Sequence, residues 1–387
     1  MNDWCPVTEK ALGFPWLFLF WRLLMDKKIE YSTISEQIEL LRSKDLIIDD
    51  VDFASEQLKQ FGYYNIINSY KAPYQKDSDG KKVFIPGTSF KQIFSLFTFD
   101  HTLRNAIMSS MLALEEHIKA AAAEVLSQSF GTDQNNYLAW KNFRDRRRSQ
   151  ERFGLKGTLE KLQKDLLSDK NPIKYYRETY GIVPPWILFK GSYFSTVVNF
   201  VRLFKEPQKK YFVKLLYNCS DELCANKDVK TLLFDTLSIC LEYRNLAAHG
   251  GRVYNYTPNA EVRLDDISSV IPLDSSLSDL YSWHGLCLLL NLLDIFPYKE
   301  PRDIIDRALT SELNRHLDLY ERDLDFLGEV LNLNIFTESD DCILIEGKEY
   351  PIKTRKQSGI PGMFIVDAPE ELREMWETIP VDAPPDN

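Results

Sequence analysis

Residues 90–129 carry apolar side chains at the clearest helical spacing in the chain. The intervals between these side chains are four, four, three, four, four and three residues, which keeps all of them on one face of an α-helix. They are Leu103, Ile107, Met111, Leu114, Ile118, Ala122 and Val125. Gly131 follows at a position where glycine commonly ends a helix. The pattern predicts one long helix, around which the other elements must pack.

The rest of the body also shows helical periodicity. Helices are predicted within residues 32–59 (two, broken around Asp49-Asp50), 184–204, 228–248, 277–296 and 301–331. After residue 336 the composition changes to short alternating or β-branched runs interrupted by glycines, which favours a small hairpin. We therefore expect an all-α fold with an N-terminal helical module and a small, partly extended C-terminal tail.

The net charge of the chain is unevenly distributed. The 387 residues carry a formal charge of −10 at pH 7, and residues 337–387 contribute −7 of it. Bulk acidity excludes a protein that coats nucleic acid by charge alone. The nearly neutral remainder is compatible with a local basic groove. One basic run, residues 141–152, is interpreted either as a solvated helix face or as a phosphate contact, and it contains Arg144, Arg146, Arg147 and Arg148.

The cysteines and the N-terminal apolar run indicate the compartment. Six cysteines are scattered without a CxxC pair, which is typical of reduced thiols in a cytoplasmic protein. Cys219, Cys224, Cys240 and His249 do not have the spacing of a known zinc site, so no metal and no cofactor is expected. Residues 11–25 are too few to span a bilayer and are interpreted as a buried or docking segment rather than a membrane contact.

Arg244 and His249 form the densest group of chemically useful side chains. Phosphate-loop, dinucleotide, hydrolase-elbow and zinc-hydrolase motifs are absent from the sequence. Arg244 continues the apolar line of Leu233, Leu237 and Cys240, so it is predicted to point toward the core or a cleft. A straight helix would separate Arg244 from His249 by about 140°. The Gly250-Gly251 pair ends the helix and lets the imidazole turn back. The alternative is a histidine on a helix dipole with an incidental arginine.

The surrounding motif, R-N-x-x-A-H-x-x-R-x-aromatic-N, resembles the R-x4–6-H signature of the HEPN superfamily. Within it, the chain resembles the bacterial abortive-infection family of the AbiD/AbiF type over roughly residues 31–300. Ordered motifs carry this resemblance: residues 35–48, Tyr63-Tyr64 with Tyr70, G-x-x-F at 87–90, F-D-x-x-L-R at 99–104, Glu115 with Lys119, and Pro184-Pro185-Trp186. The chain departs from the family pattern at Asp45 (usually glycine), His101 and Lys119 (usually arginine) and Lys190 (near a usual glutamate).

The resemblance and the composition together predict a domain order along the chain. The resemblance implies an N-terminal helical module at residues 31–86 and a HEPN-type helical bundle at residues 87–300, whereas residues 1–30 have no counterpart in the family and are expected to be an apolar extension. Residues 301–336 are expected to be a helical extension, and residues 337–387 an acidic tail.

The resemblance also implies a chemistry, which is metal-independent RNA cleavage by attack of the 2′-hydroxyl. His249 would act as general acid or base, because imidazole ordinarily titrates near neutral pH. Arg244 would bind and neutralise the phosphate, and Asn245 would orient one of these groups. Arg252 and Asn255, just past the turn, are expected to contact phosphate or brace the loop.

Arg104, Glu115 and Lys119 share one face of the long helix. Two interpretations remain open for Glu115 and Lys119. The two side chains form an ordinary ion pair at a spacing of four residues, or they form an outer layer that orients Arg244.

The single R-x4-H motif implies a homodimer, because HEPN nucleases build their site from two such units. The resulting hypothesis is an abortive-infection toxin directed against phage, restrained by a non-coding RNA or a protein antitoxin. The alternative is a non-catalytic HEPN scaffold that binds RNA or protein.

Overall fold

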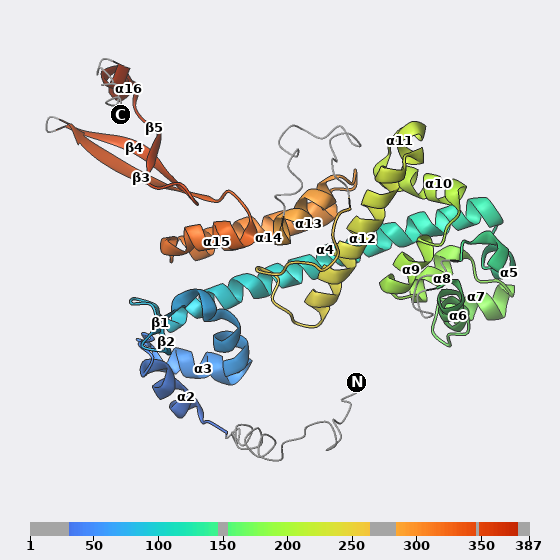
Figure 1. The fold of residues 1–387 in the computed structure, drawn as a ribbon, viewed down its shortest axis with the longest axis horizontal. Helices are drawn as coiled ribbons and strands as arrows, with labels where there is room; N and C mark the ends of the chain where they lie inside the picture. Colours follow the sequence, from blue (N-terminus) through green and yellow to red (C-terminus); the bar gives the residue numbers. More distant parts are fainter. Residues whose placement is uncertain (1–30, 146–153, 264–283, 346–347, 378–387) are drawn as a thin grey trace, which may run out of the picture. The chain divides into compact units, whose positions relative to one another are not determined.

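The computed structural model describes residues 31–145, 154–263, 284–345 and 348–377. The chain divides into two compact units, residues 1–93 and residues 94–387. The boundary falls inside α4 (Phe90–Phe130), the long helix of Figure 1. Every residue of its predicted apolar stripe is fully buried, which confirms the helix and its core-facing side.

From residue 31 on, where the structure describes it, the first unit contains two short α-helices and a hairpin. Thr33 and Glu36 form a reciprocal capping box at the start of α2 (Ile34–Arg42), and Asp50 caps α3 (Val51–Phe61). A short π-helix, η1 (Tyr64–Asn68), and a 3₁₀ turn, η2 (Ala72–Tyr74), follow, and then the antiparallel strands β1 (Gln75–Ser78) and β2 (Lys81–Phe84). The predicted break between the two helices is confirmed.

Asp45 follows α2 in the left-handed backbone region, with a φ of 67°. Glycine adopts this conformation at little cost, whereas aspartate tolerates it through local hydrogen bonding. Aspartate is therefore tolerated at this left-handed position.

The second unit is helical around α4 and α12, which cross in Figure 1. After α4 the chain forms α5 (Gln134–Tyr137), η3 (Trp140–Asn142), α6 (Leu155–Leu166), α7 (Ile173–Tyr180), α8 (Pro185–Gly191), α9 (Phe194–Val201), α10 (Glu206–Tyr217), α11 (Asp221–Ala225), α12 (Lys227–Ala248), α13 (Gly285–Asp294), α14 (Glu300–Leu317), η7 (Glu321–Asp323) and α15 (Leu324–Leu331). Among these described elements, no helix is long and apolar enough to cross a membrane. The all-α prediction is confirmed for this body.

Two predicted helices are each divided in the structure. Residues 184–204 form α8 and α9, because Ser192 is extended between them. The break fits local packing: a Cβ on Gly191 would lie 2.5 Å from Ile173 Cδ1, and the Ser192 hydroxyl donates a 2.7 Å hydrogen bond to Asp165. Residues 301–331 form α14 and α15, with η7 between them.

The C-terminal region is more ordered than a hairpin. Strands β3 (Phe336–Ile345), β4 (Lys348–Gln357) and β5 (Phe364–Asp367) form an antiparallel sheet in that order, and α16 (Glu370–Glu377) follows. Leu372 of α16 is fully buried against Tyr350 and Ile352 of β4. This small core stabilises a three-stranded sheet within a segment for which the sequence predicted only a small hairpin in an acidic tail. The predicted frayed end at residues 380–387 lies outside the described residues.

Candidate functional site

The C-terminus of α12 forms the turn that presents His249. His249 is the residue after the last helical position, and Gly250 adopts the left-handed conformation with a φ of 72°. The N–H of Gly250 donates to the carbonyl of Ala247, and the N–H of Gly251 donates to the carbonyl of Leu246. This pair of hydrogen bonds is the Schellman motif. The helix therefore ends where the glycine pair predicted.

Asp100 and Arg104 on α4 fix the loop that follows this turn. Asp100 is fully buried, and its Oδ1 accepts 2.8 Å hydrogen bonds from the backbone N–H groups of Val253 and Tyr254. Arg104 donates a 3.2 Å hydrogen bond to the carbonyl of Gly250 and lies 3.9 Å from the Asp100 carboxylate. Asp100 was not predicted as a site residue. Its signal was an aspartate four residues before Arg104, inside the F-D-x-x-L-R motif.

Glu115 lies between two of the basic side chains expected near the site, Lys119 and Arg244. Its Oε1 forms an ion pair with Lys119 Nζ at 2.7 Å, and its Oε2 lies 3.9 Å from Arg244 Nε. Glu115 Oε2 and Arg244 Nε are buried, and neither has a hydrogen-bond partner in the described part of the chain. Both sequence interpretations of the Glu115–Lys119 pair are therefore compatible with the structure, since it is an ion pair that also approaches Arg244.

The side chains around the turn point outward. Four of these side chains are exposed: Asn245, His249, Arg252 and Asn255. The side chain of Arg244 is 27% exposed. Among the described residues, no hydrogen bond joins the imidazole of His249 to Arg244. The expected approach of these two side chains therefore stays a prediction.

Glu242, two residues before Arg244, stabilises the chain beyond the turn. Its carboxylate accepts hydrogen bonds from the Tyr256 hydroxyl at 2.9 Å and from the backbone N–H groups of Asn259 and Ala260 at 2.7 and 3.0 Å. Burial and this hydrogen bond raise the pKa of Tyr256 to about 12. The phenol therefore stays neutral at physiological pH, where it donates to the carboxylate. The loop after His249 is held at both ends.

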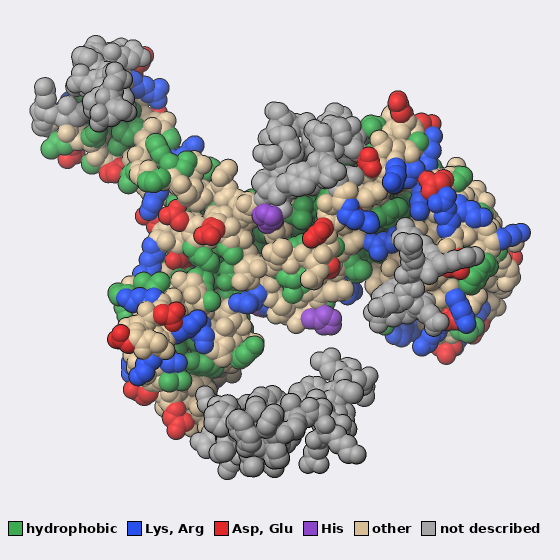
Figure 2. Space-filling model, in the orientation of Figure 1, with side chains coloured by type: hydrophobic (Ala, Val, Ile, Leu, Met, Phe, Trp, Pro, Cys, Tyr) green, Lys and Arg blue, Asp and Glu red, His purple; other side chains and the backbone are tan. Residues whose placement is uncertain are grey.

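Arg144 does not join this group. It forms a 3.1 Å ion pair with Glu206 at the start of α10. The neighbouring Phe143 packs on Phe130, the last residue of α4, which is about 22 Å along the helix from Glu115. Figure 2 shows Lys and Arg side chains gathered over the part of the molecule that carries α10. Arg146, Arg147 and Arg148 lie outside the described residues.

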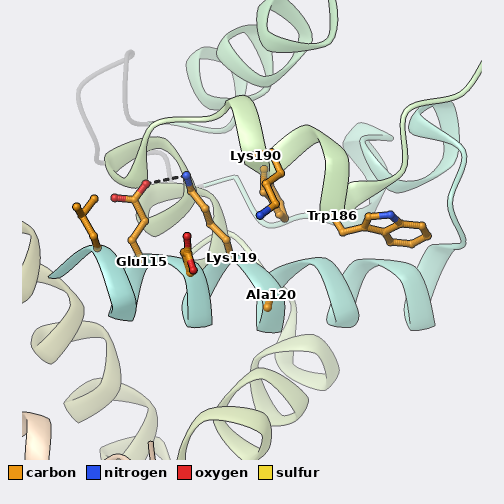
Figure 3. Close-up of a pocket in the computed structure, with 8 residues that line it drawn as sticks. Glu115, Lys119, Ala120, Trp186 and Lys190 are labelled. Atoms are coloured by element: carbon orange, nitrogen blue, oxygen red, sulfur yellow. Dashed lines mark ion pairs between the residues drawn. The ribbon is translucent and has the colours of Figure 1, made fainter. Parts of the chain in front are cut away.

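A pocket of about 320 Å³ opens beside Glu115, between α4 and α8. Leu112, Glu115 and Lys119 line it from α4, and Trp186, Phe189 and Lys190 line it from α8. Figure 3 shows the Glu115–Lys119 ion pair on α4, with Lys190 of α8 beside Lys119 and Trp186 farther along the helix. Trp186 belongs to the Pro184-Pro185-Trp186 motif and Lys190 is a departure from the family pattern, but neither was predicted as a site residue.

The cysteines considered as metal ligands are dispersed. Cys219 and Cys224 lie with their sulfurs 2.6 Å apart near α11, whereas Cys240 is buried inside α12. Burial raises the pKa of the Cys240 thiol to about 12, which disfavours the thiolate that metals bind. Among the described residues, no three His, Cys, Asp or Glu side chains are grouped as a metal site requires.

Comparison with known families identifies the chain. The family described as Abi-like protein matches residues 56–255, which is more than half of the sequence. The chain belongs to the Abi-like family. The match ends at Asn255 and so contains α4, the pocket helix α8 and the whole Arg244–His249 turn. Membership suggests a role in abortive infection. No curated protein and no solved structure matches the chain.

Proposed function

We propose that this Abi-like protein is a metal-independent endoribonuclease that acts as a toxin in abortive infection against phage. The observation that carries the proposal is Arg244, a partly buried guanidinium whose Nε has no hydrogen-bond partner in the described part of the chain, five residues before an exposed imidazole. An arginine in this state is suited to bind phosphate, because its forked donors match two phosphate oxygens.

The proposed reaction needs no group beyond the protein and its RNA. The 2′-hydroxyl attacks the adjacent phosphorus and loses its proton, and the 5′-oxygen leaves and gains one. The products are a 2′,3′-cyclic phosphate and a 5′-hydroxyl. His249 performs one of these proton transfers, and Arg244 stabilises the charge that develops on the phosphate. Asn245 is one helical position past Arg244 and exposed, and orients the RNA or the imidazole.

A single chain supplies one imidazole at this site, whereas the two proton transfers benefit from two. We therefore propose a homodimer in which two Arg244–His249 turns face each other across a two-fold axis. A non-coding RNA or a protein antitoxin is proposed to restrain this activity before infection.

The test uses expressed full-length protein and total RNA in the presence of EDTA. The wild-type chain is expected to arrest growth and degrade RNA, and His249→Ala and Arg244→Ala are expected to do neither. Matched controls are His284→Ala, the residue that precedes α13, and Arg307→Ala, an exposed arginine of α14. Both controls should behave like wild type. RNA binding without cleavage by the wild-type chain would instead favour a non-catalytic scaffold.

A further inference from the structure

The pocket between α4 and α8 has features that the proposed reaction does not use. Trp186 is 47% exposed, although its neighbours Pro185, Ile187, Leu188 and Phe189 are buried. Those neighbours attach α8 to the core, and about half of the indole surface stays available to a ligand.

Two lysines line the same pocket as this indole. Lys190 lies one turn after Trp186 on α8, and Lys119 approaches from α4, farther from the indole. The charge of Lys119 is balanced by Glu115 at 2.7 Å, whereas Lys190 is exposed. An aromatic face next to cations is the combination with which proteins bind single-stranded nucleic acid: bases stack on the ring, and phosphates contact the cations.

Glu115 forms the end of the pocket nearest Arg244. Its residue exposure is 8%, and its two oxygens lie 2.7 Å from Lys119 Nζ and 3.9 Å from Arg244 Nε. The carboxylate neutralises Lys119 and leaves Lys190 as the exposed cation of the pocket.

The size and position of the pocket fit one nucleotide. At about 320 Å³ it lies at the lower end of the range, roughly 300 to 1,000 Å³, that small-molecule sites occupy. Lys119 and Arg244 approach the two oxygens of one carboxylate, so the pocket is adjacent to the proposed cleavage site.

We infer that this pocket is a nucleotide subsite of the RNA substrate, in which Trp186 stacks on a base next to the scissile phosphate and Lys190 contacts its phosphate. The inference rests on the proposed ribonuclease function, since it names a place where the same RNA strand binds.

The test measures the affinity of a labelled single-stranded RNA for the full chain carrying His249→Ala, which blocks cleavage. Adding Trp186→Ala is expected to weaken binding by about 5- to 150-fold, the effect of losing one stacked base. Trp186→Phe should keep most of the affinity, because phenylalanine retains a stacking face. The matched control is Trp140→Ala, since Trp140 is 51% exposed but lies outside the pocket.

A second arm tests Lys190. Lys190→Ala is expected to reduce the slope of log Kd against log salt concentration by about 0.7, the value for one phosphate contact on a single strand. Lys156→Ala, an exposed lysine of α6, should leave the slope unchanged. An oligonucleotide of the same length without bases should bind equally to the chains with and without Trp186→Ala.

The outcomes separate the two proposals. Equal affinities for Trp186→Ala and Trp140→Ala, with RNA still cleaved by the wild-type chain, would overturn the subsite and leave the ribonuclease proposal intact. Sensitivity to Trp186→Ala with a nucleoside monophosphate but not with the oligonucleotide would also overturn the subsite. No RNA binding by the His249→Ala chain, together with no RNA cleavage by wild type, would overturn both.

Discussion

Glu115 Oε2 lies 3.9 Å from Arg244 Nε, and both atoms are buried without a hydrogen-bond partner in the described residues. The separation is too long for a hydrogen bond, so the carboxylate attracts the guanidinium without binding it tightly. Arg244 is thereby held in place, and the part of its side chain that is exposed, 27%, is where a phosphate can reach it. The two residues come from α4 and α12, and their approach fixes how these helices present the site.

Glu115→Gln is expected to lower the rate of RNA cleavage at saturation by about 10- to 100-fold, because Arg244 loses the charge that orients it. RNA affinity should stay the same or increase, since a negative charge next to the phosphate is removed. The measurement is kcat and KM for a defined RNA. Glu124→Gln, an exposed glutamate of the same helix, is the control. A rise in KM at unchanged kcat would contradict an orienting role.

Asp100→Ala is expected to destabilise the protein by about 2–4 kcal/mol, because two buried N–H groups lose their acceptor. Asp100→Asn should cost less, since an amide oxygen still accepts a hydrogen bond. Urea unfolding measures both variants. Asp169→Ala, whose side chain is 88% exposed, should change stability little. If Asp100→Ala were no more destabilising than Asp169→Ala, the loop anchor would be refuted.

Gly250→Ala and Gly131→Ala should each lower the free energy of unfolding by about 1–2 kcal/mol, because both glycines have a left-handed backbone that alanine disfavours. The added Cβ meets no atom within 4 Å at either position, so no clash adds to this cost. Only Gly250→Ala is expected to reduce RNA cleavage, since that turn presents His249. Thermal unfolding and cleavage assays on the two variants separate these effects. Equal cleavage by both variants would show that the geometry of the turn does not matter to catalysis.

The proposed dimer predicts a mass of about 90 kDa by light scattering, twice the 45.1 kDa of the chain. The measurement should be made at the protein concentration used for cleavage, because a weak dimer dissociates on dilution. A catalytically active monomer would exclude the composite site.

Much of the fold was predictable because helical periodicity is a local signal. The stripe from Leu103 to Val125 identified α4, and the glycine pair identified the end of α12. The division at Ser192 was not predicted; the contacts made there, with Ile173 and Asp165, are distant in sequence and leave no local signal. The sheet after residue 336 was underestimated for a similar reason, since the core around Leu372 forms only when strands and helix meet.

Candidate site residues, but not their contacts, could be named from the sequence. The sequence pointed to Arg244, His249, Glu115 and Lys119 through spacing and through the family resemblance. It did not reveal that Asp100 accepts two hydrogen bonds from the loop, because backbone donors leave no trace in the sequence. It also grouped Arg144 with the site by charge alone, whereas the structure pairs Arg144 with Glu206.

The most direct test of the central claim is the cleavage of one defined RNA, and of the same strand with 2′-deoxyribose, by the purified full chain in EDTA. The proposed chemistry predicts that only the RNA is cut, leaving a 2′,3′-cyclic phosphate and a 5′-hydroxyl, and that His249→Ala abolishes this cleavage while His284→Ala does not. Cleavage of the deoxy strand, 5′-phosphate products, or full activity of the His249→Ala chain would contradict it.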